Sequence, residues 1–264
     1  MNSTENVEQN LEYIESQLKL ANNSGVDLIQ LPENFAQMPA HPKQQYIEEA
    51  SGGLVQKYLS EMANQYQLQI IAGSLPIQSN RDDLPFARSL VVDASGQVIA
   101  QYDKIHLYDV DLPNGDKYRE SKTYTAGKLS KENILPVKTA LANLGLSICY
   151  DLRFPELYRE LVAKGADILC VPSAFTQSTG RVHWQTLLQS RAIENLAFVM
   201  AAAQVGTHAN GRKTWGHSMV VSPWGVVLDQ LTNETGLLIA EVDLTSITKL
   251  RAEFPVLNHR RLKI

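Results

Sequence analysis

The sequence predicts an α/β fold in which two sheets pack face to face and helices cover their outer faces. Three observations support this class. Segments of helical periodicity alternate with short apolar runs, several of these runs are joined by tight turns, and no internal repeat or low-complexity linker interrupts the chain. The hairpins favour a layered sandwich over a purely parallel barrel. At 264 residues, the chain is expected to form one domain, residues 1–264.

The elements follow in order from the same two signals. An amphipathic helix is predicted between an N-cap at Ser3 or Thr4 and a stop at Gly25. The elements predicted after it are strand 26–31, helix 44–65, strands 68–75, 86–92 and 97–102, strand 144–149, a helix from Pro155, strand 167–171, helix 182–195, strand 197–204, a hairpin around 222–225 and strand 237–242. Glu33 and Cys149 are therefore expected at the ends of buried strands.

Composition excludes several classes of function. A net charge of −4 with interspersed signs provides no positive field for nucleic acid, so a small-molecule partner is expected. No apolar stretch is long enough to span a bilayer and the N-terminus does not resemble a secretion signal, so a cytoplasmic protein without membrane contact is expected. The two cysteines match neither a disulfide framework nor a zinc spacing, and no motif indicates a metal or an organic cofactor.

Three chemically distinct side chains follow predicted strands: the carboxylate of Glu33, the ammonium of Lys104 and the thiol of Cys149. Ends of strands are where α/β folds gather reactive groups. Together these groups supply what acyl transfer needs, namely a nucleophile, a base that takes its proton and a cation facing the oxyanion. We expect burial to raise the pKa of Glu33 and the following helix to favour the Cys149 thiolate.

Each residue taken alone has a simpler interpretation. Cys149 could pack as a small buried hydrophobe, as Cys170 is expected to do. Glu33 could cap a helix or lie on the surface, and Lys104 could be an ordinary solvated charge. The histidines show no metal-binding spacing and are interpreted as structural; they are His41, His106, His183, His208, His217 and His259.

Four strings in order resemble the signature blocks of the carbon-nitrogen hydrolase (nitrilase) superfamily. They are LPENF around Glu33, YDKIHL around Lys104, ESKTYTAG from Glu120 and CYDLRFPELYR from Cys149. The resemblance runs from about residue 3 to the C-terminus. It implies a four-layer αββα sandwich, which the family usually pairs into a homodimer or a higher homo-oligomer.

The resemblance also implies a role for each matched residue. Glu33 corresponds to the general base and Cys149 to the nucleophile that forms a thioester. Lys104 and the backbone N–H of Tyr150 correspond to the groups that stabilise the oxyanion, and Glu120 to a second glutamate near the lysine. A thioester divides one difficult amide cleavage into two easier steps, and the same glutamate can protonate the leaving amine and then activate water.

Within the superfamily, segments 172–176, 179–184, 191–194 and 216–225 are similar to the Nit-type branch, which contains deaminated glutathione amidase and ω-amidase. Segment 201–204 is closer to the first of these. This resemblance implies cleavage of deaminated glutathione to 2-oxoglutarate and cysteinylglycine, a metabolite-repair reaction. Cleavage of 2-oxoglutaramate, and a non-catalytic binding module on the same fold, are the alternatives.

Three further residues are candidates for substrate binding. An anionic α-keto acid calls for a cation, and Arg153, four residues after the nucleophile, could form a bidentate contact with a carboxylate. Arg153 could equally be held in an ion pair with Asp151 or Glu156. Phe175 and Thr176 could line the acyl pocket, although Phe175 could also belong to the core.

The chain departs from the family at its N-terminus. Family members usually begin with an apolar strand that leads into the first helix, whereas this sequence starts with Met1-Asn2-Ser3, where that strand would have ended. The fold is therefore expected to lack the family's first strand. An open sheet edge favours aggregation, so this form is expected to be less stable or less soluble than one extended upstream.

Overall fold

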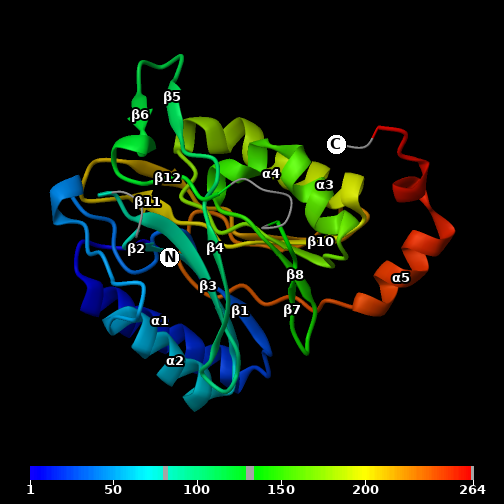
Figure 1. Cartoon of the computed structure of the whole chain (residues 1–264), viewed down its shortest axis with the longest axis horizontal. Coiled ribbons are helices and arrows are strands. Elements are labelled where there is room, and N and C mark those ends of the chain that lie inside the picture. The colour runs from blue at the N-terminus through cyan, green and yellow to red at the C-terminus, as the bar shows by residue number, and fades with distance from the viewer. Residues whose placement is uncertain (80–82, 129–133, 263–264) are drawn as a thin grey trace.

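The computed structural model describes residues 1–79, 83–128 and 134–262, and two sheets form its centre (Figure 1). The first sheet has the order β1-β2-β3-β4. Its strands are β1 (Leu28–Gln30), β2 (Gln69–Ile77), β3 (Phe86–Val92) and β4 (Val98–Asp103). β1 pairs with β2 in parallel, and the other neighbours are antiparallel, because tight turns connect them.

The second sheet has six strands in the order β14-β13-β10-β9-β8-β7. They are β7 (Val137–Lys138), β8 (Asn143–Leu146), β9 (Ile168–Cys170), β10 (Phe198–Ala201), β13 (Met219–Val221) and β14 (Val227–Gln230). The central strands β8, β9 and β10 are parallel. Their carboxyl ends therefore meet at one edge of the sheet, where the loop that carries Cys149 begins.

Helices cover both outer faces, which gives four layers. α1 (Val7–Asn23) and α2 (Leu54–Tyr66) pack on the first sheet through one apolar cluster, and α3 (Pro155–Ala163) and α4 (Gln177–Asn195) pack on the second through another. A third cluster, which includes Ile71, Val91 and Leu146, lies between the sheets. The predicted αββα sandwich is confirmed, since each apolar face is buried against a neighbouring layer.

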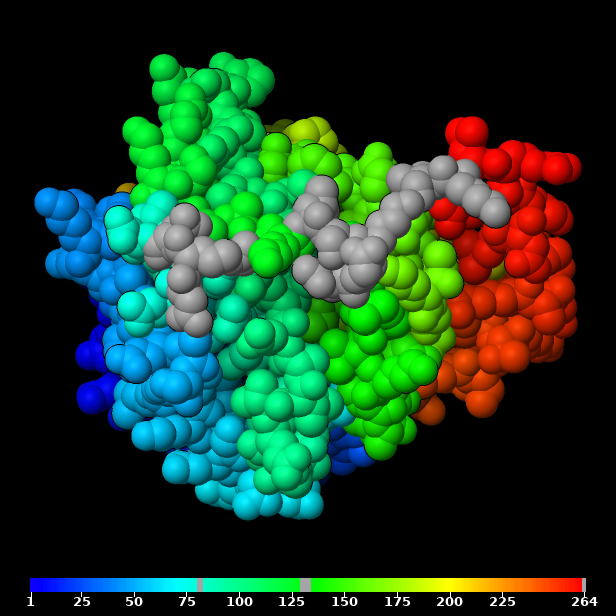
Figure 2. Space-filling model, viewed as in Figure 1, coloured from blue at the N-terminus to red at the C-terminus, as the bar shows by residue number. Residues whose placement is uncertain are grey.

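Two short hairpins and a C-terminal helix complete the described fold. β5 (Asp109–Asp111) pairs with β6 (Lys117–Arg119), and this hairpin projects from the surface (Figure 2). β11 (Val205–Thr207) pairs with β12 (Lys213–Trp215), and α5 (Leu244–Glu253) follows the last strand. No helix within the described ranges is both long and apolar enough to cross a bilayer.

Several predicted boundaries were wrong for local reasons. The N-cap of α1 is Asn6, whose side chain accepts a hydrogen bond from the Gln9 N–H, rather than Ser3 or Thr4. α2 begins at Leu54 instead of residue 44, because the Glu48 carboxylate accepts from the N–H of Val55 at 2.5 Å and thereby caps the helix there. The polar segment after residue 108 contains the β5–β6 hairpin, and residues 129–132 of that segment lie outside the described residues.

The predicted strand 237–242 is not a strand in the structure. A strand needs a hydrogen-bonded neighbour, and in the described part of the chain this segment pairs with no other strand. A groove of about 620 Å³ separates it from β1, and the walls include Leu28, Ile29 and Leu237. β1 is thus an edge strand, and no strand precedes α1 among the residues described, as the departure from the family pattern predicted.

Candidate active site

Glu33 lies three residues after β1 with 4% of its surface exposed. Its Oε1 accepts a hydrogen bond of 2.8 Å from Lys104 Nζ, and its Oε2 accepts one of 2.7 Å from the backbone N–H of Ala174. The chain reaches this position by passing very close to β2, since a Cβ at Gly73 would lie 1.9 Å from the Pro32 carbonyl oxygen. Both carboxylate oxygens are therefore held in fixed directions.

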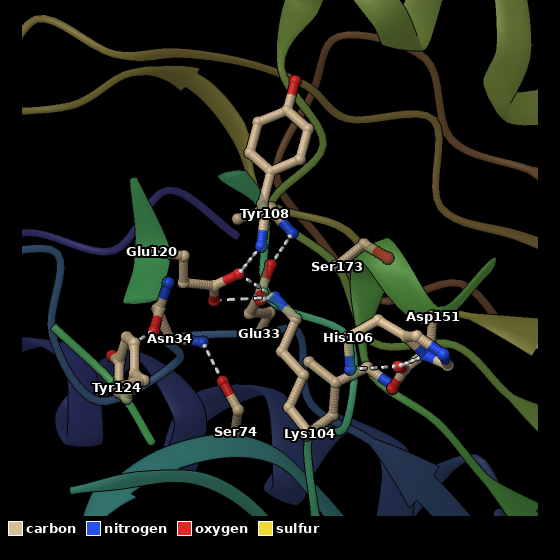
Figure 3. A network of polar contacts seen from close by, with 12 residues as sticks. Glu33, Asn34, Ser74, Lys104, His106, Tyr108, Glu120, Tyr124, Asp151 and Ser173 are labelled. Carbon is tan, nitrogen blue, oxygen red and sulfur yellow. Dashed lines mark hydrogen bonds and ion pairs between the residues drawn. The ribbon is translucent and has the colours of Figure 1, made fainter. Parts of the chain in front are cut away.

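Lys104 follows β4 directly and is 1% exposed. Its ammonium lies 2.8 Å from Glu33 Oε1 and 2.7 Å from Glu120 Oε1, so it bridges two carboxylates (Figure 3). Glu120 begins a short helical turn after β6, and its Oε2 also accepts a hydrogen bond of 2.6 Å from the Tyr108 N–H. The solvated-lysine interpretation is thus wrong, because Lys104 is buried and doubly paired.

Cys149 is the first residue of a 3-10 turn, Cys149–Arg153, that follows β8. Its φ of 48° places it in the left-handed region, which is uncommon for a residue other than glycine. The Cys149 N–H donates a hydrogen bond of 2.9 Å to the Pro172 carbonyl oxygen. A sharp turn of this kind directs the thiol out of the sheet edge and toward the two glutamates and the lysine.

The ionisation of Glu33 differs from the prediction. Burial raises the pKa of this carboxyl, but the positive charges of Lys104 and Arg212 and the hydrogen bonds from Lys104 and Cys149 outweigh burial and lower the pKa below 4.5. Glu33 is therefore ionised at neutral pH. Glu120 shows the opposite balance, since burial and the charge of Glu33 raise its pKa despite Lys104.

The Cys149 thiol also departs from the expected behaviour. Burial, followed by the negative charge of Glu33 and a hydrogen bond to that carboxylate, raises the pKa of the thiol well above 9.0, against the lowering effects of Lys104 and Arg212. The expectation that the helix terminus favours the thiolate was wrong. The resting pair is a neutral thiol beside an ionised carboxylate, which is the arrangement that proton transfer from thiol to base requires.

These groups line one cavity of about 750 Å³. Its walls come from the loops after β1, β4, β8 and β9 and from the two hairpins, β5–β6 and β11–β12. Six Lys or Arg and three Asp or Glu side chains line it, although the whole chain carries a net charge of −4. The positive balance of the cavity suits an anionic ligand.

The candidate binding residues also reach this cavity. Tyr150, Arg153, Phe175 and Thr176 all line it. The Arg153 guanidinium lies 5.3 Å from the Phe175 ring centre and 5.8 Å from that of Tyr150. Phe175 also contacts Trp184 at 5.1 Å between ring centres, so this residue belongs to both the cavity wall and the core.

Arg153 is not held by an acidic neighbour. Among the residues that the structure describes, it forms no ion pair with Asp151 or Glu156, and its Nη1 donates a long hydrogen bond of 3.4 Å to His183 Nδ1. Asp151 instead accepts from His106 and Tyr102. The guanidinium therefore remains available to a carboxylate ligand.

Sequence reasoning missed three contributors to the site. The Ala174 N–H holds Glu33, Asp151 connects the loops of Lys104 and Cys149, and Arg212 places a second guanidinium in the cavity wall. Asp151 stood inside a matched string and could have been singled out there. Ala174 acts through its backbone and Arg212 belongs to a polar turn, so neither left a signal in the sequence.

Comparisons with known proteins agree with this geometry. The family model for carbon-nitrogen hydrolase matches residues 1–252. The chain is 42% identical to a deaminated glutathione amidase of Synechocystis sp. over 263 residues, which cover 98% of this chain and 95% of the relative. It is also 42% identical to a deaminated glutathione amidase of Yersinia enterocolitica, covering 98% and 90% of the two chains.

Solved structures show the same fold. The C. elegans NitFhit protein superposes with a TM-score of 0.91 at 37% identity, covering 99% of this chain and 63% of that longer one. A mutant amidase of Nesterenkonia sp. AN1, in which acrylamide has added to the active-site cysteine, superposes with a TM-score of 0.75 at 25% identity, covering 97% and 95%.

Proposed function

The chain belongs to the carbon-nitrogen hydrolase family, and from that premise we propose that it hydrolyses the amide bond of deaminated glutathione to give 2-oxoglutarate and cysteinylglycine. The observation that carries the proposal is the neutral thiol of Cys149 beside an ionised glutamate, Glu33, which is itself paired to the buried Lys104. Full-length relatives that are named deaminated glutathione amidase support the choice of substrate.

In the first half of the reaction, Glu33 takes the thiol proton as Cys149 Sγ attacks the amide carbonyl carbon. Lys104 and the Tyr150 N–H stabilise the negative charge that develops on the carbonyl oxygen. The tetrahedral intermediate then collapses, the C–N bond breaks, and Glu33 returns the proton to the leaving amine. The acyl group remains on Cys149 as a thioester.

In the second half, Glu33 removes a proton from water, and the hydroxide attacks the thioester carbonyl. The C–S bond breaks, the carboxylic acid leaves, and the proton returns to the sulfur. Glu120 holds the Lys104 ammonium from the side opposite Glu33, at 2.7 Å, and so fixes its direction toward the oxyanion. The resting state is restored without another reactant.

The substrate carries carboxylates, and Arg153 is proposed to bind the one on the α-keto acid side. Its support is the absence of an acidic partner among the described residues and its place on the same turn as Cys149. Phe175 and Thr176 are proposed to line the acyl side of the cavity.

The test is hydrolysis of deaminated glutathione, followed by release of 2-oxoglutarate, with the native chain and Cys149→Ala. Turnover by the native chain that is lost in the variant supports the proposal. Faster turnover of 2-oxoglutaramate, which releases ammonia instead of a dipeptide, would assign ω-amidase activity. No turnover of either substrate, together with unchanged folding, would favour a binding module.

We further propose that the protein acts in the cytoplasm as a homo-oligomer of single-domain subunits. Both cysteines are free, which suits a reducing compartment. Trp224 is 61% exposed, Ile193 51% and Val226 54%, so apolar surface is available for a second subunit. Light scattering of the purified chain tests the assembly, and replacing Trp224 by Glu is expected to weaken it.

A further inference from the structure

Arg212 is a cavity residue with no role in the reaction as described above. It lies in the turn between β11 (Val205–Thr207) and β12 (Lys213–Trp215). The turn is fixed by two hydrogen bonds: the Arg212 N–H donates to Asn210 Oδ1 at 2.9 Å, and the His208 N–H donates to the Arg212 carbonyl oxygen at 2.9 Å. The side chain therefore leaves a defined backbone position and reaches the cavity wall.

The guanidinium of Arg212 is held, but it is not neutralised. Its Nη2 donates to the Ala174 carbonyl oxygen, and its Cζ lies 5.7 Å from the centre of the Tyr118 ring. Nε is buried without a hydrogen-bond partner, and no carboxylate in the described part of the chain forms an ion pair with Arg212. A partly buried cation with spare donors is costly unless a ligand completes it.

The position of Arg212 assigns it to one side of the scissile bond. Ala174 accepts from Arg212 through its carbonyl oxygen and donates to Glu33 Oε2 through its N–H, at 2.7 Å. The guanidinium is thus one residue from the carboxylate that protonates the leaving amine. Arg153, by contrast, lies on the turn that carries Cys149 and contacts the rings of Tyr150 and Phe175.

We propose that Arg212 binds a carboxylate on the leaving amine and so selects peptide-like leaving groups with a free C-terminus over ammonia. This inference rests on the proposed amidase function. In deaminated glutathione the partner is the glycine carboxylate of cysteinylglycine. The two arginines then divide the substrate, Arg153 on the acyl side and Arg212 on the leaving-group side, and Arg212 is the specificity-determining residue.

The test crosses two enzymes with two substrates. Native enzyme and Arg212→Met are assayed on deaminated glutathione and on its analogue with a C-terminal carboxamide in place of the glycine carboxylate. We expect Arg212→Met to raise KM for deaminated glutathione at least about tenfold, because a hydrogen bond to a charged group contributes one to two factors of ten. Native enzyme should lose about as much on the carboxamide, and the variant should lose little more.

Two control variants separate binding from general electrostatics. Lys213→Met removes a neighbouring, exposed charge from the same hairpin and should affect the carboxylate and carboxamide substrates equally. Arg153→Met should impair both substrates and 2-oxoglutaramate, whereas Arg212→Met should spare 2-oxoglutaramate, whose leaving group is ammonia.

Two results would overturn the inference while leaving the amidase function intact. One is equal turnover of carboxylate and carboxamide by native enzyme. The other is an equal loss on all three substrates in Arg212→Met, which would show that Arg212 acts only through Glu33. Absence of turnover by native enzyme on every substrate would instead refute the amidase function and, with it, this inference.

Discussion

The backbone N–H of His106 donates a hydrogen bond of 3.1 Å to Asp151 Oδ1, and the His106 Nδ1 lies 2.7 Å from the same oxygen. His106 is two residues from Lys104, and Asp151 is two residues from Cys149. This contact therefore joins the loop of the cation to the loop of the nucleophile across the two sheets. Because Asp151 is fully buried, the contact fixes their separation in an environment without competing water.

Asp151→Asn should disturb that separation. The second oxygen of Asp151 accepts from the Ile148 N–H at 2.9 Å and from the Tyr102 hydroxyl at 2.7 Å, so both oxygens face N–H or O–H donors. An amide offers one acceptor oxygen and leaves at least one N–H facing a donor, which costs about 1–3 kcal/mol. We expect urea denaturation to show this loss and kcat to fall about tenfold or more through misplacement.

The matched control for Asp151→Asn is Asp229→Asn, which makes the same chemical change on an exposed strand of the second sheet. Unchanged stability and kcat are expected for this control. If Asp151→Asn also leaves kcat unchanged, the contact between the two loops does not position the reacting groups.

The pH dependence of kcat/KM should report Glu33. Its pKa is lowered below 4.5 despite burial, because Lys104 and Arg212 stabilise the ionised form. A lowered folded-state pKa means that the ionised group contributes stability above about 4.5 and that this contribution is lost as the pH falls through the lower folded value. We expect kcat/KM, measured in brief assays after a pH jump, to remain constant from pH 7 down to about 4.5 and to decline only below it. An acid limb centred above that value would contradict the ionisation state assigned to Glu33.

The sequence predicted the positions of the chemical groups better than their ionisation. Apolar runs that end at Glu33 and Cys149 are local signals, so both residues could be placed at strand ends. The pKa of Glu33 depends on Lys104, which is 71 positions away in the chain, and on Arg212 from another hairpin. Burial alone predicts the wrong direction for Glu33, because the direction depends on partners that only the fold brings together.

The same limit explains the error in the fold. Residues 237–242 have the composition of a strand, but a strand is defined by a neighbour, and a groove separates this segment from β1. Local pattern also missed the helix start at Leu54, because its cap is supplied by the Glu48 side chain at 2.5 Å from the Val55 nitrogen rather than by an adjacent polar residue.

Alkylation should distinguish the two cysteines. Cys149 lines the cavity and is 7% exposed, whereas Cys170 is fully buried between the sheets. Iodoacetamide at pH 8 should therefore modify Cys149 first, as peptide mass spectrometry would show, and 2-oxoglutarate should slow this reaction by occupying the acyl side of the cavity. Equal rates at both cysteines in folded protein would contradict the position assigned to Cys149.

Glu33→Gln should separate thiol ionisation from catalysis. The charge and the hydrogen bond of Glu33 raise the pKa of Cys149, whereas Lys104 and Arg212 lower it. Removing the carboxylate charge should therefore lower the thiol pKa, seen as a downward shift in the midpoint of thiolate absorbance at 240 nm. Amide hydrolysis should be lost at the same time, because the base is gone. An upward shift, or retained hydrolysis, would count against Glu33 as the base.

Lys104 should show that the buried charges are mutually dependent. Its pKa is raised well above 10.5, since the nearby charges of Glu120, Glu33 and Cys149 outweigh burial, and its ammonium lies within 2.8 Å of both glutamates. Lys104→Met leaves two buried carboxylates without their cation and should destabilise the fold by about 3–5 kcal/mol. Adding Glu120→Gln removes one of the two charges, so the double variant should regain part of this stability while remaining inactive for want of the oxyanion cation. Urea denaturation of the two single variants and the double variant, with 2-oxoglutarate release from each, measures both effects. Additive losses in stability would show that Lys104 and Glu120 are not energetically coupled, because only a shared interaction makes the second substitution less costly once the first has been made.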